Sequence, residues 1–297
     1  MILVNSFGGC ATTTFTKQLW NSFFRDHTPV APMLVYDDGL SIANTDKLDC
    51  RGLKHTNLPP SCKPIDTRGH GRHYSCIKPG SNRRLDRNAF HSGTDVVIDR
   101  AVYLYVNPIK AVTTFLMQPR GLSMINQEVI PWPVGHAKNL GGDWRRMNTL
   151  LKSEEPEGFN DMVRLAERAR ALGVDDEIKV QPGLNFYCEE RKDLFGLEKH
   201  FDNWTTGQHE YPILAVKYET MWEQENIRKI AHFLDLDGRF INNFPQKRAR
   251  TKDIKDTPSY LMTALKEIHS SLIEKMEAAP PCMLNGEEYA HTFEVVE

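Results

Sequence analysis

The stretch that decides the fold stands at the start of the chain, Met1-Ile-Leu-Val-Asn-Ser-Phe-Gly-Gly-Cys-Ala-Thr-Thr-Thr14. Its apolar run, Met1–Val4, predicts a short buried strand. The glycine-rich residues 6–11 predict a loop. Between residues 12 and 24, Phe15, Leu19 and Phe23 recur at i, i+4 and i+8, which predicts an amphipathic helix. A strand, a glycine loop and a helix in this order open a βαβ unit.

The glycine loop is a candidate phosphate-binding site. A turn of this kind exposes consecutive backbone N–H groups, which together with the helix dipole attract an anion. The candidate residues are Gly8, Gly9, Cys10, Ala11, Thr12, Thr13 and Thr14. The ATP-binding form of the loop needs a lysine before its Ser or Thr, whereas the nearest lysine here, Lys17, lies inside the helix. A plain turn that binds nothing is the alternative.

Later apolar patterns extend the βαβ unit into an α/β fold. Strands are predicted at 33–36, 96–106 and 211–218, and the near-continuous apolar run of 96–106 is typical of a central parallel strand. Helices are predicted from Pro108, at 161–172, 191–201 and 223–234, and as one amphipathic helix over 259–276. Residues 56–94 predict a long loop, 118–160 turns, and 244–252 a basic loop. No linker interrupts the chain, so we expect a single three-layer domain over 1–297, with a central mainly parallel sheet flanked by helices.

Composition excludes several classes of protein. With 37 basic and 39 acidic residues the net charge is -2, so no overall basic field favours a nucleic acid partner. No segment approaches the roughly 20 apolar residues of a membrane span, and the start of the chain lacks a secretory signal. We expect a cytoplasmic protein, or a soluble part of a protein anchored elsewhere. The six cysteines form no C-x-x-C pair, so no metal is expected, although a site among 50–76 stays an alternative.

Five segments, in order along the chain, resemble the sulfotransferase family that uses 3'-phosphoadenosine 5'-phosphosulfate (PAPS). Gly9–Thr13 stands where that family has its Lys-Ser-Gly-Thr-Thr loop, and Leu53–Pro60 resembles its Lys-Thr-His-Leu-Pro stretch. Tyr103–Thr114 resembles its Arg-Asp-Pro strand end and the helix that follows. Two later segments complete the set. One is the pair Tyr218-Glu219 before the helical pattern at 227–234, and the other is Phe244–Thr251, which stands where the family has a basic loop.

The resemblance implies a P-loop domain that moves a sulfuryl group from PAPS to a hydroxyl, with a small molecule or a glycan as acceptor and no metal. It implies His55 as the base that accepts the proton of the hydroxyl, and Lys54 beside it as a catalytic cation. The glycine loop would hold the 5'-phosphosulfate. The implied contacts of the 3'-phosphate side are Asn107, Thr114, Arg248, Arg250, Thr251 and Lys252.

Three departures from the family pattern keep other functions open. The family lysine falls on Gly9, the family arginine falls on Val106, and the family histidine falls on Asn57, two residues after His55. Lys54, Lys110, Arg248 and Arg250 are candidates to replace the missing charge. A P-loop small-molecule kinase and a catalytically inactive nucleotide-binding relative are the alternatives. The acceptor and the oligomeric state do not follow from the sequence.

Overall fold

The computed structural model describes residues 2–6, 8–12, 14–15, 18–19, 53–54, 100–116, 132–151, 182–236, 238–247 and 257–290. The chain divides into two compact units. Unit 1 combines Met1–Val106, Phe201–Arg248 and Ala279–Glu297, and unit 2 combines Asn107–His200 and Ala249–Ala278. The expectation of one domain over 1–297 stays a prediction.

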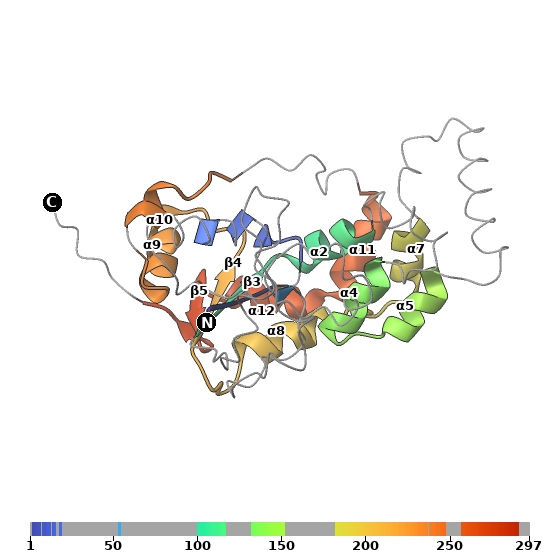
Figure 1. The fold of residues 1–297 in the computed structure, drawn as a ribbon. Coiled ribbons are helices and arrows are strands. Elements are labelled where there is room, and N and C mark those ends of the chain that lie inside the picture. Colours follow the sequence, from blue (N-terminus) through green and yellow to red (C-terminus); the bar gives the residue numbers. More distant parts are fainter. Residues whose placement is uncertain are drawn as a thin grey trace, which may run out of the picture. The chain divides into compact units, whose positions relative to one another are not determined.

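Unit 1 is built on a mainly parallel sheet, as predicted (Figure 1). Its described strands are β1 (Ile2–Ser6), β2 (Leu53–Lys54), β3 (Arg100–Tyr105), β4 (Ile213–Lys217), β5 (Cys282–Leu284) and β6 (Glu287–Glu288). They lie in the order β2-β1-β3-β4-β5-β6. The pairings among β2, β1, β3 and β4 are parallel, and β5 and β6 add an antiparallel edge that the sequence reading missed.

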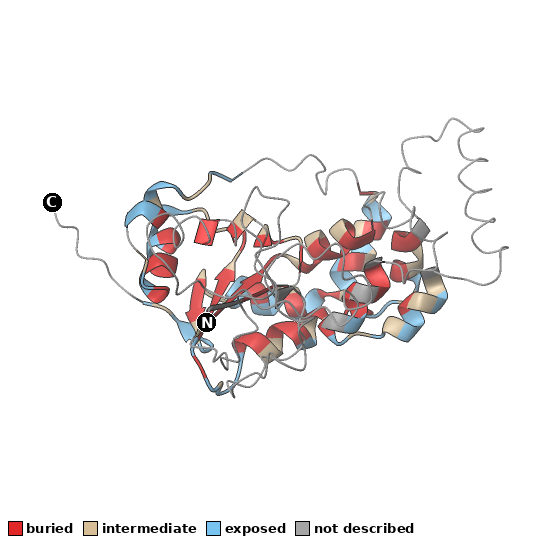
Figure 2. Ribbon diagram, in the orientation of Figure 1, coloured by how far each residue is buried: buried red, intermediate tan, exposed pale blue. Residues whose placement is uncertain are grey.

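The central strand β3 is buried on both faces. Each residue from Ala101 to Tyr105 is fully inaccessible to solvent, and successive side chains of a strand point to opposite faces (Figure 2). On one face Tyr103 stacks on Trp204 with ring centroids 5.5 Å apart, and Tyr105 packs edge-on against Phe201. Both partners belong to α8 (Leu197–Thr205). The apolar run of the sequence therefore marks the strand, as expected for a parallel sheet.

Two more helices of unit 1 follow β4. In α9 (Gln224–Phe233) the apolar face formed by Ile227, Ile230 and Ala231 is buried, as predicted. Its carboxyl end is fastened to the sheet, because Arg100 Nη1 donates to the carbonyl oxygen of Phe233 at 2.6 Å. The short α10 (Gly238–Asn242) comes next.

Unit 2 is helical over the described residues. It contains α2 (Pro108–Leu116), α4 (Trp132–Leu140), α5 (Trp144–Leu151), α7 (Pro182–Glu189), α11 (Ser259–Ile268), α12 (Ser270–Ala278) and the first turn of α8. The ring of Phe115 packs against His136 at 4.6 Å and Phe195 at 4.9 Å, which joins α2, α4 and the turn before α8. Asn107 Oδ1 accepts a hydrogen bond from Ile109 N at 3.0 Å, so Asn107 caps α2 and Pro108 lies in its first turn, as predicted.

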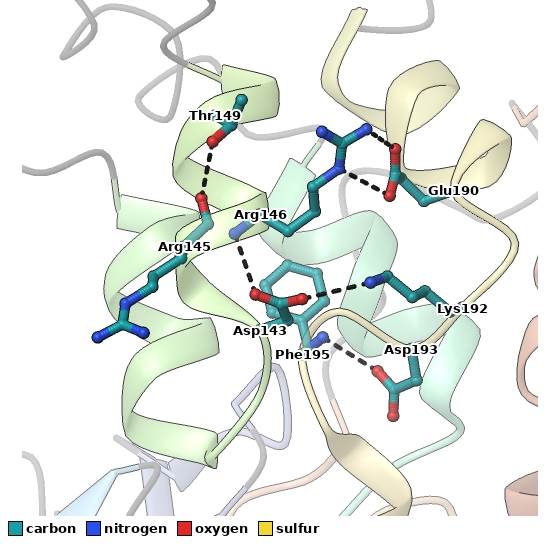
Figure 3. A network of polar contacts seen from close by, with 8 residues as sticks. All are labelled: Asp143, Arg145, Arg146, Thr149, Glu190, Lys192, Asp193 and Phe195. Carbon is teal, nitrogen blue, oxygen red and sulfur yellow. Dashed lines mark hydrogen bonds and ion pairs between the residues drawn. The ribbon is translucent and has the colours of Figure 1, made fainter.

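A surface network joins α5 to the turn after α7 (Figure 3). The Asp143 carboxylate accepts from the backbone N–H of Arg146 at 3.0 Å and from Lys192 Nζ at 3.3 Å. The guanidinium of Arg146 forms a two-point ion pair with Glu190. Hydrogen bonding to the Arg146 N–H holds the pKa of Asp143 below its ordinary value, and hydrogen bonding to the Arg146 side chain does the same for the pKa of Glu190.

Three expectations about helices are wrong. Residues 132–151 form two helices rather than turns, with Gly141 and Gly142 at the bend between them. The helix expected over 191–201 begins at Leu197, because the Asp193 carboxylate accepts the N–H groups of Phe195 and Gly196 and shapes a turn first. The helix expected over 259–276 is interrupted at His269. The features expected at 33–36, 56–94 and 161–172 lie outside the described residues.

Among the described helices, none combines the length and the apolar character needed to cross a membrane.

Candidate functional site

The glycine loop lies at the carboxyl end of β1, and its backbone has an unusual conformation. Gly8, Gly9 and Ala11 have positive φ angles of 96°, 68° and 55°. Glycine adopts such angles freely, but an alanine there is strained by roughly 1–2 kcal/mol. The carbonyl oxygen of Ala11 then accepts the N–H groups of Thr14 at 2.8 Å and Phe15 at 3.0 Å, so the helix starts immediately after the strained residue. Strained backbone of this kind is concentrated at binding loops.

Side-chain hydroxyls close the loop on itself. Ser6 Oγ and Thr12 Oγ1 lie 2.7 Å apart, and Ser6 Oγ also accepts the N–H of Gly8 at 3.1 Å. Ser6 and Thr12 are buried. The sequence reading treated the Thr12 hydroxyl as a donor for a ligand, whereas here it is engaged with Ser6. Thr14 is half-buried and Cys10 is fully buried, with its Sγ donating to the carbonyl oxygen of Gly8 at 3.0 Å.

The strand order puts this loop at a place where α/β sheets bind ligands. The chain runs from β1 outward to β2 and then returns to β3 on the other side of β1. Such a reversal of direction opens a crevice at the carboxyl ends of the two strands on either side of it. Those ends are Ser6 of β1 and Tyr105 of β3.

The same edge of the sheet carries Lys54. Lys54 is the last residue of β2, and in the parallel pairing it stands directly opposite Ser6. The backbone positions of one predicted catalytic residue and of the glycine loop are thus adjacent. Six other predicted site residues lie outside the described residues, namely Thr13, His55, Arg248, Arg250, Thr251 and Lys252.

An aromatic cluster fastens the start of the basic loop to this edge. Phe244 packs against Phe15 of the helix after the glycine loop, with ring centroids 6.4 Å apart, and against Trp222 at 5.8 Å. Lys247 Nζ donates to the carbonyl oxygen of Glu219 at 3.0 Å and lies 5.9 Å from the ring centre of Tyr218. Glu219 and Tyr218 directly follow β4, so the chain enters the basic segment from the carboxyl edge of the sheet.

The aromatic residues that follow β4 or lie in α8 differ in burial. Trp204 and Tyr218 are buried and serve as packing residues. Trp222 is half-buried, and its indole Nε1 is buried with no hydrogen-bond partner in the described structure. The contact of Phe15 with Phe244 joins residues far apart in the chain, so no local pattern could have found this cluster.

The predicted residues of unit 2 have structural contacts of their own. Asn107 caps α2, as described above. Thr114 is half-buried, and its Oγ1 donates to the carbonyl oxygen of Lys110 at 2.6 Å, one turn earlier in the same helix. A threonine hydroxyl can rotate away from such a bond to donate to a ligand.

In the part of the chain that the structure describes, no three His, Cys, Asp or Glu side chains gather to hold a metal ion. No protein-family model matches the sequence, and comparisons with curated proteins and with solved structures find no significant match. The site has to be interpreted from its own geometry.

Proposed function

We propose that the protein is a PAPS-dependent sulfotransferase of the P-loop, three-layer type, which acts on a hydroxyl group of a small molecule or glycan. The observation that carries the proposal is the loop of Gly8, Gly9 and Ala11, all with positive φ angles, which leads into a helix beside the strand-order reversal between β1 and β3. Anions bind at such helix starts because backbone N–H groups and the helix dipole both favour negative charge. The order of the five family-like segments supports a doubly phosphorylated adenosine as the ligand.

The proposed chemistry is an in-line transfer. The bond from sulfur to the phosphate oxygen of the donor breaks while a bond from sulfur to the acceptor oxygen forms. His55 takes the proton of the acceptor hydroxyl, since a histidine titrates near neutral pH. Backbone N–H groups of the glycine loop stabilise the phosphate that leaves. Catalysis of this kind depends mainly on positioning and on donors directed at the developing charge.

Lys54 is proposed to replace the family lysine, whose place in this chain is taken by Gly9. Its backbone stands opposite Ser6 at the carboxyl edge of the sheet, where the glycine loop begins. There it would neutralise the bridging oxygen as the phosphate departs. The contacts proposed for the 3'-phosphate are those that the family resemblance implies, namely Asn107, Thr114, Arg248, Arg250, Thr251 and Lys252.

A thermal-shift titration tests the proposal. Adenosine 3',5'-bisphosphate should stabilise the protein, by about 2.7 kcal/mol at a concentration one hundred times its dissociation constant. ATP with Mg²⁺ should not. Lys54→Met should weaken the binding, whereas the matched Lys266→Met, at an exposed position of α11, should leave it unchanged. Stabilisation by ATP and Mg²⁺ alone would instead favour a small-molecule kinase, and no shift with either ligand would exclude a nucleotide site.

The second candidate is an inactive relative that binds the nucleotide without transferring a group. Gly9 and Val106 favour it, because both stand where the family has a phosphate-binding cation. An assay with radiolabelled PAPS and a panel of hydroxyl acceptors separates the two. Binding of the bisphosphate without transfer to any acceptor or to water would support the inactive relative.

A further inference from the structure

His269 is a buried histidine at the junction of two helices in unit 2. It ends α11, donating its backbone N–H to the carbonyl oxygen of Leu265, and its own carbonyl oxygen accepts the N–H of Ile273 in α12. Its side chain is 2% exposed. The imidazole stacks on the ring of Tyr187 in α7 at an interplanar angle of 13°, and its Nε2 lies 2.9 Å from the Tyr187 hydroxyl. One buried polar contact thus joins the junction of α11 and α12 to α7.

The groups around this contact leave no acceptor for a second imidazole proton. The Tyr187 hydroxyl donates to Asp193 Oδ1 at 3.3 Å. The Asp193 carboxylate also accepts the backbone N–H groups of Phe195, Gly196 and Glu198 at 3.0–3.2 Å, so its oxygens are already engaged. His269 Nδ1 is buried, and the described structure offers it no hydrogen-bond partner.

Protonation of the ring therefore disfavours the packed state. An imidazolium ion carries N–H groups on both nitrogens, and the one on Nδ1 would be buried without an acceptor. A buried donor of this kind and a buried charge both oppose the folded arrangement. The ring can become charged without this penalty only if it reaches water.

The charged groups near His269 only partly offset the penalty. Burial lowers the pKa of His269 below its ordinary value, while the negative charges of Asp193 and Glu198 act in the opposite direction. Glu198 is itself held by Ser271 Oγ at 2.6 Å and Lys275 Nζ at 2.9 Å. The other charged residues of the elements packed on α11 are Lys110 of α2, Glu189 of α7, Lys266 and Glu267 of α11, and Glu274, Lys275 and Glu277 of α12.

We propose that His269 is an acid-sensitive latch, whose protonation shifts α11 from its packed position on α7 toward an open state. The sign follows from linkage. A histidine with a lowered pKa binds fewer protons in the packed state than in the open one, so the packed state loses stability as pH falls through the ordinary value of 6.5. The inference concerns unit 2 alone and does not depend on the proposed nucleotide site.

Cys188 provides a local probe of the latch. Its side chain is buried, its Sγ lies 4.0 Å from the carbonyl oxygen of Leu261 in α11, and burial raises its pKa to about 11. Movement of α11 away from α7 would expose this thiol. The described cysteines of unit 1, Cys10 and Cys282, are also buried and report on unit 1 in the same sample.

The experiment is labelling of the native protein with a dipyridyl disulfide, a reagent that reacts in mild acid, followed by peptide mass spectrometry. Rates are divided by those of the unfolded protein at the same pH. Between pH 7.5 and 5.5 the relative rate at Cys188 should rise by up to about tenfold, the limit when opening takes up one proton at a group with a pKa near 6.5 in the open state. The rate at Cys282 should stay unchanged. A constant rate at Cys188, or an equal rise at Cys282, would overturn the proposal.

Two variants assign the effect to the imidazole. His269→Gln can still donate to Tyr187 but does not titrate, so its labelling at Cys188 should not depend on pH. The matched His232→Gln, at an exposed histidine of α9, should behave like the wild-type protein. If His269→Gln does not fold, an NMR titration of the His269 ring in the wild-type protein tests the proposal instead. A measured pKa of His269 at or above 6.5 would overturn the latch.

Discussion

Ser6 and Thr12 hold the two ends of the glycine loop together through hydroxyl groups 2.7 Å apart. Ser6 is the last residue of β1 and Thr12 lies in the first turn of the helix, so this single contact sets the width of the loop. The same Ser6 oxygen accepts the N–H of Gly8 at 3.1 Å. These contacts within the loop constrain its shape, which reduces the ordering that a ligand would have to impose.

Removing the Ser6 hydroxyl should loosen this loop. In Ser6→Ala the Gly8 N–H and the Thr12 hydroxyl both lose a buried partner, which should lower the free energy of unfolding by about 1–3 kcal/mol. Thr12→Ser keeps the hydroxyl and should cost less. Urea denaturation of Ser6→Ala, Thr12→Val and the double variant Ser6→Ala/Thr12→Val measures the effect. Fully additive costs in the double variant would show that the two hydroxyls do not interact.

Gly142 should not tolerate a side chain. A Cβ atom there would lie 2.6 Å from the carbonyl oxygen of Phe195 and would overlap that of Leu194, both parts of the backbone. Gly142→Ala should therefore destabilise unit 2 by at least about 2 kcal/mol. Gly238 of α10 has no atom within 4 Å of the same position, so Gly238→Ala serves as the control. Equal urea midpoints for the two variants would contradict this packing.

Asp143 should stabilise α5 mainly as a cap. Asp143→Ala removes the acceptor of the Arg146 N–H and should cost about 1 kcal/mol, whereas Asp143→Asn retains a capping oxygen and should cost less. Because the Arg146 N–H lowers the pKa of Asp143, its contribution is present above the ordinary value of 3.8 and is lost as pH falls below it. Urea midpoints at pH 7 and pH 3 for wild type and Asp143→Asn test this. If the difference in urea midpoint between wild type and Asp143→Asn is as large at pH 3 as at pH 7, the charged cap would be contradicted.

Trp204 should be one of the most costly residues to truncate in unit 1. It is 1% exposed and stacks on Tyr103 at the centre of the sheet. Trp204→Ala should lower the free energy of unfolding by about 3–5 kcal/mol, because the cavity sits over a strand that cannot collapse into it. Trp204→Phe keeps an aromatic ring there and should cost markedly less. Calorimetry of the wild-type protein and the two variants measures their unfolding temperatures. Equal unfolding temperatures for Trp204→Ala and Trp204→Phe would contradict this prediction.

Strands and helices with strong periodic patterns could be predicted from the sequence. The central strand β3, β4 and α9 were predicted from the sequence. Their buried residues form continuous apolar runs in the strands and an apolar repeat near 3.6 residues in the helix. The helices α4, α5 and α7 were missed. They are eight or nine residues long, and glycine or proline lies within α4 and α7 and between α4 and α5, so local patterns favoured turns.

By itself the sequence determined that the chain opens with a strand, a glycine loop and a helix, because these depend on neighbours within a few residues. The sequence also predicted that Lys54 and the loop belong to one site. The parallel pairing of β2 with β1 sets the backbone of Lys54 opposite Ser6, where the loop begins. Only the tertiary structure decided which hydroxyl closes the loop, which aromatic rings fasten the basic segment, and that His269 interrupts a helix to reach Tyr187. Each of these contacts depends on the distance between two side chains. When the two residues are far apart in the chain, that distance is set by tertiary packing and not by the neighbouring residues in the sequence.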